Sequence, residues 1–134
     1  MAEDRPGWLA TTGRVRSGQG DLAGRMREFA ELYREKLGVD CVPGSLNVEL
    51  GEPYDLPPGG ARIEPGEHGC PVGVSFAPCR VEGKAAFVVR TDANAAGRGD
   101  HPRTIVELVG PLHFRTALGL EEGDEVRLEL PAAP

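Results

Sequence analysis

The sequence predicts a single mostly-β domain with short helices, built around a small barrel. A chain of 134 residues suits one compact domain, and 40% hydrophobic residues can supply its core. Only 5% of the residues are aromatic, so Val, Leu and Ala must fill most of that core. The 19 Gly and 12 Pro predict many turns and short elements, which favours a small barrel over a helix bundle.

The first part of the chain predicts a leader, a strand and a helix. We expect residues 1–10 to form a flexible leader before a domain that spans 11–131. Alternating residues over Thr11–Ser17 predict the first strand. Apolar residues at helical spacing then predict a helix of about four turns from near Leu22 to Leu37, and Gly38 is placed to end it.

The middle of the chain predicts a strand, an extended connection and a hairpin. Alternation over residues 45–50 predicts a strand that begins after a Pro-Gly turn. The segment Glu52–Gly69 is rich in Pro and Gly, and we expect an extended connection there. Alternating apolar residues on both sides of Glu82-Gly83-Lys84 predict a hairpin that ends near Arg90.

The last part predicts a loop, two strands and a short helix. Asp92–Pro102 is polar and long enough to be a mobile flap over a site. Thr104–Val109 predicts a strand, and Pro111 can begin a short helix through Leu118. After a Gly-Asp turn, alternating apolar residues over 126–130 predict the last strand.

Charge and cysteine content limit the functions that this chain can have. A net charge of −6 and a pI of about 5.1 argue against general binding to nucleic acid, which needs a basic surface. Three Cys cannot all pair, which favours a reduced, cytoplasmic setting. No apolar run has the length of a membrane span, and the N-terminal residues show no signal-peptide pattern. The spacing of His68, Cys70 and Cys79 is looser than that of usual zinc sites.

Ser45 and Asn47 stand at the start of the strand that follows the Pro-Gly turn. Strand alternation puts them side by side on one face, opposite the apolar residues Leu46, Val48 and Leu50. Two neutral oxygen ligands suit a Mg²⁺ whose charge is balanced mostly by nucleotide phosphates. The simpler interpretation is a strand with two outward polar residues.

The glycine-rich segment between the first strand and the helix is a candidate phosphate-binding loop. Gly18, Gly20 and Gly24 would let backbone N–H groups approach phosphate oxygens near a helix N-terminus. The Gly-Lys-Ser/Thr ending of a P-loop is absent. An ordinary glycine-rich turn before a helix is the alternative.

Two charged residues nearer the C-terminus are further candidates. Glu107 shares its strand face with Ile105 and Val109, which indicates a partly buried carboxylate with a partner. The alternative is a barrel-edge carboxylate bonded to neighbouring backbone. Arg115 could hold a phosphate, or it could be an ordinary surface arginine.

Several motifs occur in one order along residues 13–130. They are Ser-Gly-x-Gly, Leu-Gly-Val, Pro-Gly-Ser-Leu-Asn-Val, Val-Glu-Leu-Val-Gly-Pro-Leu-x-Phe-Arg and Leu-Gly-Leu-Glu-Glu-Gly-Asp-Glu-Val. This order resembles that of the archaeal-type CTP-dependent riboflavin kinases. The resemblance implies a six-stranded cradle-loop barrel. It also implies transfer of the CTP γ-phosphate to the 5′-hydroxyl of riboflavin, which gives FMN and CDP.

The resemblance also assigns roles to residues of this chain. Ser45 and Asn47 would bind Mg²⁺, with Asn47 and Glu107 in catalytic roles. Glu107 and Thr91 would contact the flavin. The nucleotide-binding residues would be Gly18, Gln19, Gly20, Asp21 and Gly24 in the first loop, and His113, Phe114, Arg115 and Thr116 in a second segment.

This chain departs from the family pattern in the nucleotide loop. The usual loop continues Gly-x-Gly-Glu-Gly with an aromatic pair, whereas this one reads Gly-Gln-Gly-Asp-Leu-Ala-Gly-Arg-Met. The usual Leu-Arg-Glu has become Phe114-Arg115-Thr116. Two alternatives therefore stay open: a kinase of the same scaffold that acts on another small alcohol or nucleoside-like acceptor, and a non-catalytic barrel that binds nucleotide or flavin.

Overall fold

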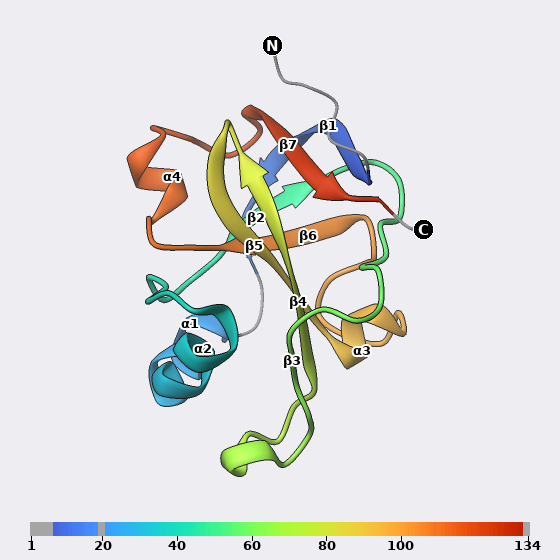
Figure 1. Cartoon of the computed structure of the whole chain (residues 1–134). Coiled ribbons are helices and arrows are strands. Elements are labelled where there is room, and N and C mark those ends of the chain that lie inside the picture. The colour runs from blue at the N-terminus through green and yellow to red at the C-terminus, as the bar shows by residue number, and fades with distance from the viewer. Residues whose placement is uncertain (1–6, 19–20, 133–134) are drawn as a thin grey trace.

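The chain folds as a closed antiparallel β-barrel, described by a computed structural model for residues 7–18 and 21–132 (Figure 1). The strand order is β3-β4-β5-β6-β2-β1-β7, and β4 also pairs with β7. That last pairing closes six strands into a ring and leaves β3 outside it, on the same edge of β4 as β7. The predicted single-domain six-stranded barrel with short helices is confirmed.

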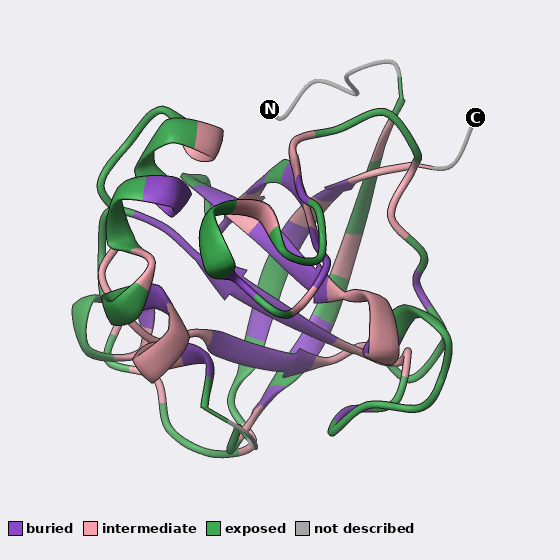
Figure 2. Cartoon of the chain, turned by 90° about the horizontal axis from the view of Figure 1, so that it is seen from below, coloured by how far each residue is buried: buried purple, intermediate pink, exposed green. Residues whose placement is uncertain are grey.

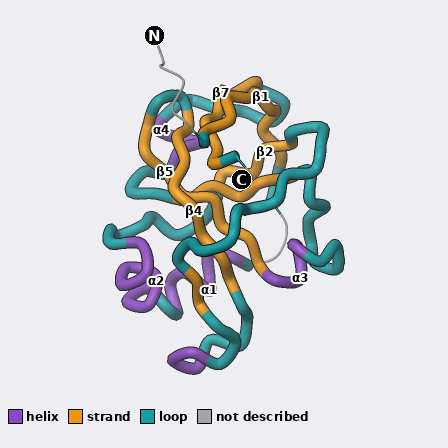
Figure 3. Tube along the Cα trace, turned by 45° about the vertical axis from the view of Figure 1, so that its right-hand side comes forward, coloured by secondary structure: helices purple, strands orange, loops and turns teal. Residues whose placement is uncertain are grey.

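The elements are short, as the glycine and proline content predicts. The strands are β1 (Trp8–Arg16), β2 (Leu46–Glu49), β3 (Arg62–Ile63), β4 (Val74–Val81), β5 (Lys84–Thr91), β6 (Ile105–Val109) and β7 (Glu125–Pro131). The helices are α1 (Leu22–Glu28), α2 (Ala30–Leu37), α3 (Asp92–Ala95) and α4 (Phe114–Ala117), with a 3-10 turn at Glu67–Gly69. Helices α1 and α2 lie on one side of β3 and β4 and α3 on the other (Figure 1), and all three lie at the end of the molecule away from β1 and β7 (Figure 3).

Strand alternation divides the apolar residues between two cores. The barrel interior takes one face of each strand, for example Leu46 and Val48 of β2 and Val106 and Leu108 of β6. A second core lies between the outer barrel face and helices α1 and α2. Its buried members are Leu22, Met26, Leu32, Tyr33, Ile63, Cys70, Val74, Phe76, Val89 and Val109. Buried residues accordingly line the strands, while the loops at the periphery are exposed (Figure 2).

The hairpin and the end of the helical segment agree with the sequence prediction. Strands β4 and β5 pair over their whole length, and the chain reverses at Glu82 and Gly83. Both residues have positive φ angles of 48° and 80°, as a tight hairpin turn requires. Gly38 ends α2 in the left-handed region at φ 78°.

The predicted helix over Leu22–Leu37 is wrong in one respect, because two helices occupy that range. The backbone leaves helical geometry at Phe29, with φ −112° and ψ 34°. Phe29 itself packs against the second core, to which both helices contribute buried residues. Apolar spacing does not reveal the break, because the residues on either side of it face the same core.

Other boundaries also differ from the prediction. Strand β1 begins at Trp8, not Thr11, because Trp8, Leu9 and Ala10 pair with β7. Residues 8–10 therefore belong to the barrel and not to a flexible leader. The loop predicted over 92–102 begins with α3. Helix α4 starts after His113, whose side chain caps it, and not at Pro111. No helix in the described part of the chain has the length and apolarity needed to cross a membrane.

Candidate functional site

Three side-chain oxygens converge on the outer face of β2 and β6. Asn47 and Glu107 stand opposite one another in the antiparallel register of these strands. The Ser45 Oγ lies 3.2 Å from Asn47 Oδ1 and 3.3 Å from Glu107 Oε2, so its hydroxyl can donate to either. Asn47 and Glu107 are 5% and 7% exposed. The predicted neighbours Ser45 and Asn47 are indeed adjacent, and Glu107 is buried with a partner.

The segment that follows β1 brings Gly18 against this group. Arg16 pairs with Asn47 in the β1–β2 register, and the chain then passes Asn47 at Gly18. A Cβ atom at Gly18 would overlap the side-chain amide nitrogen of Asn47. Glycine is therefore required here to let the backbone lie against Asn47. The predicted loop residues Gln19 and Gly20 lie outside the described residues.

The beginning of α1 is capped by the chain itself. The Asp21 carboxylate accepts a hydrogen bond of 3.0 Å from the backbone N–H of Gly24. A Cβ atom at Gly24 would overlap that carboxylate. Room for the cap is thus a sufficient structural reason for Gly24, without a phosphate.

The predicted second nucleotide segment is α4 and its cap. Phe114 is buried in the barrel core, so its side chain is not free to bind a ligand. His113 and Thr116 are exposed and contact each other, with 2.8 Å between Nδ1 and Oγ1. Arg115 Nη2 lies 4.0 Å from Glu122 Oε1, and that oxygen accepts a 2.9 Å hydrogen bond from Ser17. Glu122 therefore links α4 to the segment just before Gly18.

A cavity of about 210 Å³ opens beside Glu107. Its lining comes from α1 and its cap, the end of β5 with α3, the loop before β6, β6 itself, and Val72 before β4. The polar ones are Asp21, Arg25, Thr91, Asn94, Asp100, His101 and Glu107. The described lining contains no Phe, Tyr or Trp side chain.

Burial dominates the electrostatics of Glu107. Loss of water around the carboxylate raises its pKa. The positive charge of His101, the hydrogen bond from Ser45 and the charges of Arg25 and Arg90 act in the opposite direction. The carboxylate is thus desolvated but surrounded by groups that favour its charged form.

Thr91 and Asn94 organise the cavity wall opposite α1. Thr91 Oγ1 caps α3 by accepting a 3.1 Å hydrogen bond from the Asn94 N–H. Asn94 is buried, and its Oδ1 accepts a 3.2 Å hydrogen bond from the N–H of His101. A Cβ atom at Gly99 would overlap that same oxygen. The segment predicted as a mobile flap is therefore folded around one buried asparagine.

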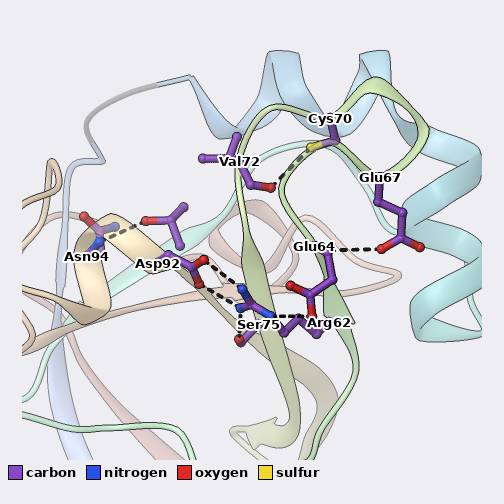
Figure 4. A network of polar contacts seen from close by, with 9 residues as sticks. Arg62, Glu64, Glu67, Cys70, Val72, Ser75, Asp92 and Asn94 are labelled. Carbon is purple, nitrogen blue, oxygen red and sulfur yellow. Dashed lines mark hydrogen bonds and ion pairs between the residues drawn. The ribbon is translucent and has the colours of Figure 1, made fainter.

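An ion pair between Arg62 and Asp92 connects β3 to α3, the helix that carries Asn94. The Arg62 guanidinium of β3 makes a bidentate pair with Asp92, the first residue of α3, at 2.7 and 2.8 Å (Figure 4). Arg62 also donates to Ser75 Oγ and Glu64 Oε2, each at 3.0 Å. The β3–β4 hairpin and α3 are thereby tied together beside the cavity.

The comparisons with known proteins identify the family. The family model CTP-dep_RFKase, described as a domain of unknown function (DUF120), matches residues 15–130. The chain belongs to this CTP-dependent riboflavin kinase family. The match includes the glycine loop, β2, β6 and α4, which carry the residues described above.

Curated relatives of the family are named riboflavin kinase. The chain is 32% identical over 117 residues to the one from Methanocella arvoryzae, covering 84% of this chain and 52% of the relative. It is 37% identical over 125 residues to the one from Pyrococcus abyssi, covering 88% and 57%. For Methanothermobacter thermautotrophicus the values are 31% over 111 residues, with 76% and 81% covered. The chain spans about half the length of the first two relatives.

The barrel of this riboflavin kinase family member brings Ser45, Asn47, Glu107 and Gly18 together and places Asp21 and Thr91 in the cavity beside Glu107. It also adds residues that the sequence did not suggest. Arg25, Asn94 and His101 line the cavity beside Glu107. His101 and Asn94 stand in the segment 92–102, which the sequence predicts to be a polar loop and where no periodic pattern predicts burial. Arg25 follows the glycine loop directly, but its place on the cavity wall depends on where α1 packs.

Side chains that usually bind metal do not form a cluster here. Within residues 7–18 and 21–132, no group of three or more His, Cys, Asp or Glu side chains could hold a metal ion. The three cysteines are free, and burial raises the pKa of the Cys79 thiol to about 12. Ser45, Asn47 and Glu107 instead offer hydroxyl, amide and carboxylate oxygens, the donors that suit Mg²⁺.

Proposed function

We propose that this domain transfers the γ-phosphate of CTP to the 5′-hydroxyl of riboflavin, giving FMN and CDP. The observation that carries the proposal is the convergence of Ser45, Asn47 and Glu107 beside Gly18, inside a family match that covers most of the chain. Phosphoryl transfer depends mainly on positioning and charge neutralisation, and this arrangement can supply both.

Ser45 and Asn47 are the residues that would hold Mg²⁺. Their two oxygens already lie 3.2 Å apart, and neither carries a charge. Mg²⁺ in phosphoryl-transfer enzymes is bound by one or two protein groups together with substrate phosphates. When bound, the ion neutralises charge on those phosphates.

Glu107 would orient the acceptor hydroxyl and accept its proton. In the proposed step the riboflavin 5′-oxygen forms a bond to the γ-phosphorus. The bond from that phosphorus to the β,γ-bridging oxygen breaks, and CDP leaves with the electron pair. The hydroxyl proton passes to Glu107 and then to solvent. A pKa raised by burial makes the carboxylate a better base.

Loops around these residues would bind the two substrates. For the nucleotide we assign the segment Gly18–Asp21 with Gly24, and the exposed part of 113–116, which Glu122 connects to it. For the flavin we assign Thr91 beside Glu107, because its hydroxyl accepts the α3 cap bond and still has a proton to donate.

One observation favours a different acceptor. A flavin ring usually stacks on aromatic or broad apolar surfaces, yet the described lining of the cavity has no Phe, Tyr or Trp. A kinase that acts on another small alcohol is therefore the second candidate function.

The proposal is tested by an activity matrix of nucleotides against acceptors. Purified protein is incubated with Mg²⁺ and each of CTP, ATP, GTP and UTP, with riboflavin or other small alcohols, and products are read by mass spectrometry. We expect FMN and CDP from the CTP and riboflavin pair. Phosphorylation of another alcohol alone would favour the second candidate. Absence of CTP binding in calorimetry would favour a non-catalytic barrel.

A further inference from the structure

Arg25 lines the cavity beside Glu107, a position that the helical spacing of its neighbours does not predict. It lies in α1 beside Leu22, which also lines the cavity, and Met26, which is buried in the second core. The same cavity has three acidic side chains, Asp21, Asp100 and Glu107. Even so, no ion pair joins Arg25 to a carboxylate in the described part of the chain.

The positive charge of Arg25 influences ionisable groups on both the barrel and the helices. Burial raises the pKa of Glu107 on β6 and of the Tyr33 hydroxyl on α2, and the charge of Arg25 opposes both rises. The Tyr33 hydroxyl is buried, and the Arg25 guanidinium lies within reach of a weak hydrogen bond to it. Arg25 thus lines the Glu107 cavity and also contacts the helix layer at Tyr33.

The other arginines around the site are already engaged. Arg90 is buried and donates to the backbone carbonyls of three residues, including a 2.6 Å bond to Tyr54. Arg62 is paired with Asp92. Arg115 is near Glu122, and its side chain is 40% exposed. Within the described residues, Arg25 is the arginine of this group that lines the Glu107 cavity and has no carboxylate or carbonyl partner, its polar neighbour being the Tyr33 hydroxyl.

We propose that Arg25 contacts the γ-phosphoryl group of the nucleotide during its transfer; this inference rests on the proposed function. A guanidinium presents a planar set of donors that matches phosphate oxygens, and its charge offsets the charge that spreads over the transferred group. Arginines in that role accelerate phosphoryl transfer by roughly 10³- to 10⁵-fold. Arg25 lies directly after the glycine loop, in the stretch that reads Gly-Gln-Gly-Asp-Leu-Ala-Gly-Arg-Met in this chain.

The inference predicts that Arg25 distinguishes a triphosphate from a diphosphate. Calorimetry with Mg²⁺ compares CTP and CDP binding to the wild type and to Arg25→Gln. We expect Arg25→Gln to weaken CTP binding about tenfold and to change CDP binding less than about twofold. Turnover should fall at least about 100-fold, and Arg25→Lys should recover part of it because the charge remains.

Two variants serve as controls. Arg27→Gln removes an exposed arginine two residues away on the same helix and should leave both affinities and turnover unchanged. Tyr33→Phe removes only the buried hydroxyl and should also leave CTP binding unchanged. If Tyr33→Phe reproduced the Arg25→Gln effect, Arg25 would act by supporting Tyr33 and the inference would fail.

Other outcomes overturn the inference in distinguishable ways. Equal losses of CTP and CDP affinity would mean that Arg25 binds another part of the nucleotide or supports the fold. Loss of riboflavin affinity alone would make it an acceptor contact. A wild type that binds CTP more tightly than CDP but makes no FMN would defeat the proposed function, and the Arg25 comparison would still be measurable.

Discussion

The strand side and the helix side of the site are held by different kinds of interaction. The strand side is Ser45, Asn47 and Glu107, which the β2–β6 register sets opposite one another. The helix side is α1 and α3, whose ends depend on single polar side chains, Asp21 and Thr91. Many backbone hydrogen bonds maintain the strand register, so one side-chain substitution does not change it. A helix cap depends on one side chain, so one substitution removes it. Substitutions on the strand side should therefore lower activity and leave the fold intact. Substitutions on the helix side should lower the free energy of unfolding.

The largest expected effect is on the strand side. Asn47→Ala removes one proposed Mg²⁺ ligand without changing the barrel interior, because Asn47 faces outward between Leu46 and Val48. We expect FMN formation to fall by at least about 1,000-fold while the melting temperature changes little. Glu49→Ala, on the same face of β2, is the control. Near wild-type turnover by Asn47→Ala would remove the metal assignment.

The next effect tests the contact between the two sides. Gly18→Ala places a Cβ atom where the Asn47 amide lies, so either the Asn47 side chain or the backbone at residue 18 must shift. A displacement of about 1 Å at a reacting centre costs about 100-fold in rate, and we expect a loss of that order in steady-state turnover. Thr12→Ala, at an exposed position of the same strand β1, is the control. Unchanged turnover in Gly18→Ala would show that the loop is not tightly coupled to Asn47.

A loss of stability is expected on the helix side. Asn94→Ala leaves the buried N–H of His101 without its acceptor, which costs about 1–3 kcal/mol in the free energy of unfolding. Asn94→Asp keeps an acceptor oxygen and should lose less. Urea unfolding of the two variants measures the difference. Equal stability of Asn94→Ala and the wild type would mean that water replaces the asparagine.

The smallest effect concerns the ion pair behind α3. The Arg62 guanidinium holds the pKa of Asp92 below its usual range. A carboxyl with a lowered folded-state pKa stabilises the protein above its unfolded-state pKa, about 3.9. That contribution is lost as the pH falls through the folded-state value. Both side chains are partly exposed, so the pair contributes less than about 1 kcal/mol. Unfolding measured from pH 7 down to pH 3 should show a shallower loss for Asp92→Asn than for the wild type, and parallel curves would contradict this.

The same contrast explains what the sequence could predict. Alternation predicts that Ser45 and Asn47 share one face of β2, because a strand has a period of two. It also indicates a partly buried Glu107, one of the two interpretations that the sequence leaves open, and Glu107 is buried. The tight turn between β4 and β5 also depends on adjacent residues alone, because Glu82 and Gly83 form it. These features depend on neighbours along the chain.

The features that the sequence did not predict depend on contacts between distant residues. The Arg62–Asp92 pair joins residues 30 positions apart, and nothing in either neighbourhood indicates it. The break at Phe29 leaves the apolar spacing intact because both helices pack on one core. Asn94 is buried because the chain folds back on it at His101, which a polar loop sequence does not reveal.

The Ser45 hydroxyl and the Glu107 carboxylate lie 3.3 Å apart, so a double-mutant cycle can test whether they act together in the proposed phosphoryl transfer. FMN formation from CTP and riboflavin with Mg²⁺ is measured for the wild type, Ser45→Ala, Glu107→Gln and the double variant. We predict that each single variant loses nearly as much activity as the double, because either change disrupts the shared group of oxygens. Losses that simply multiply in the double variant would show independent residues and contradict the account.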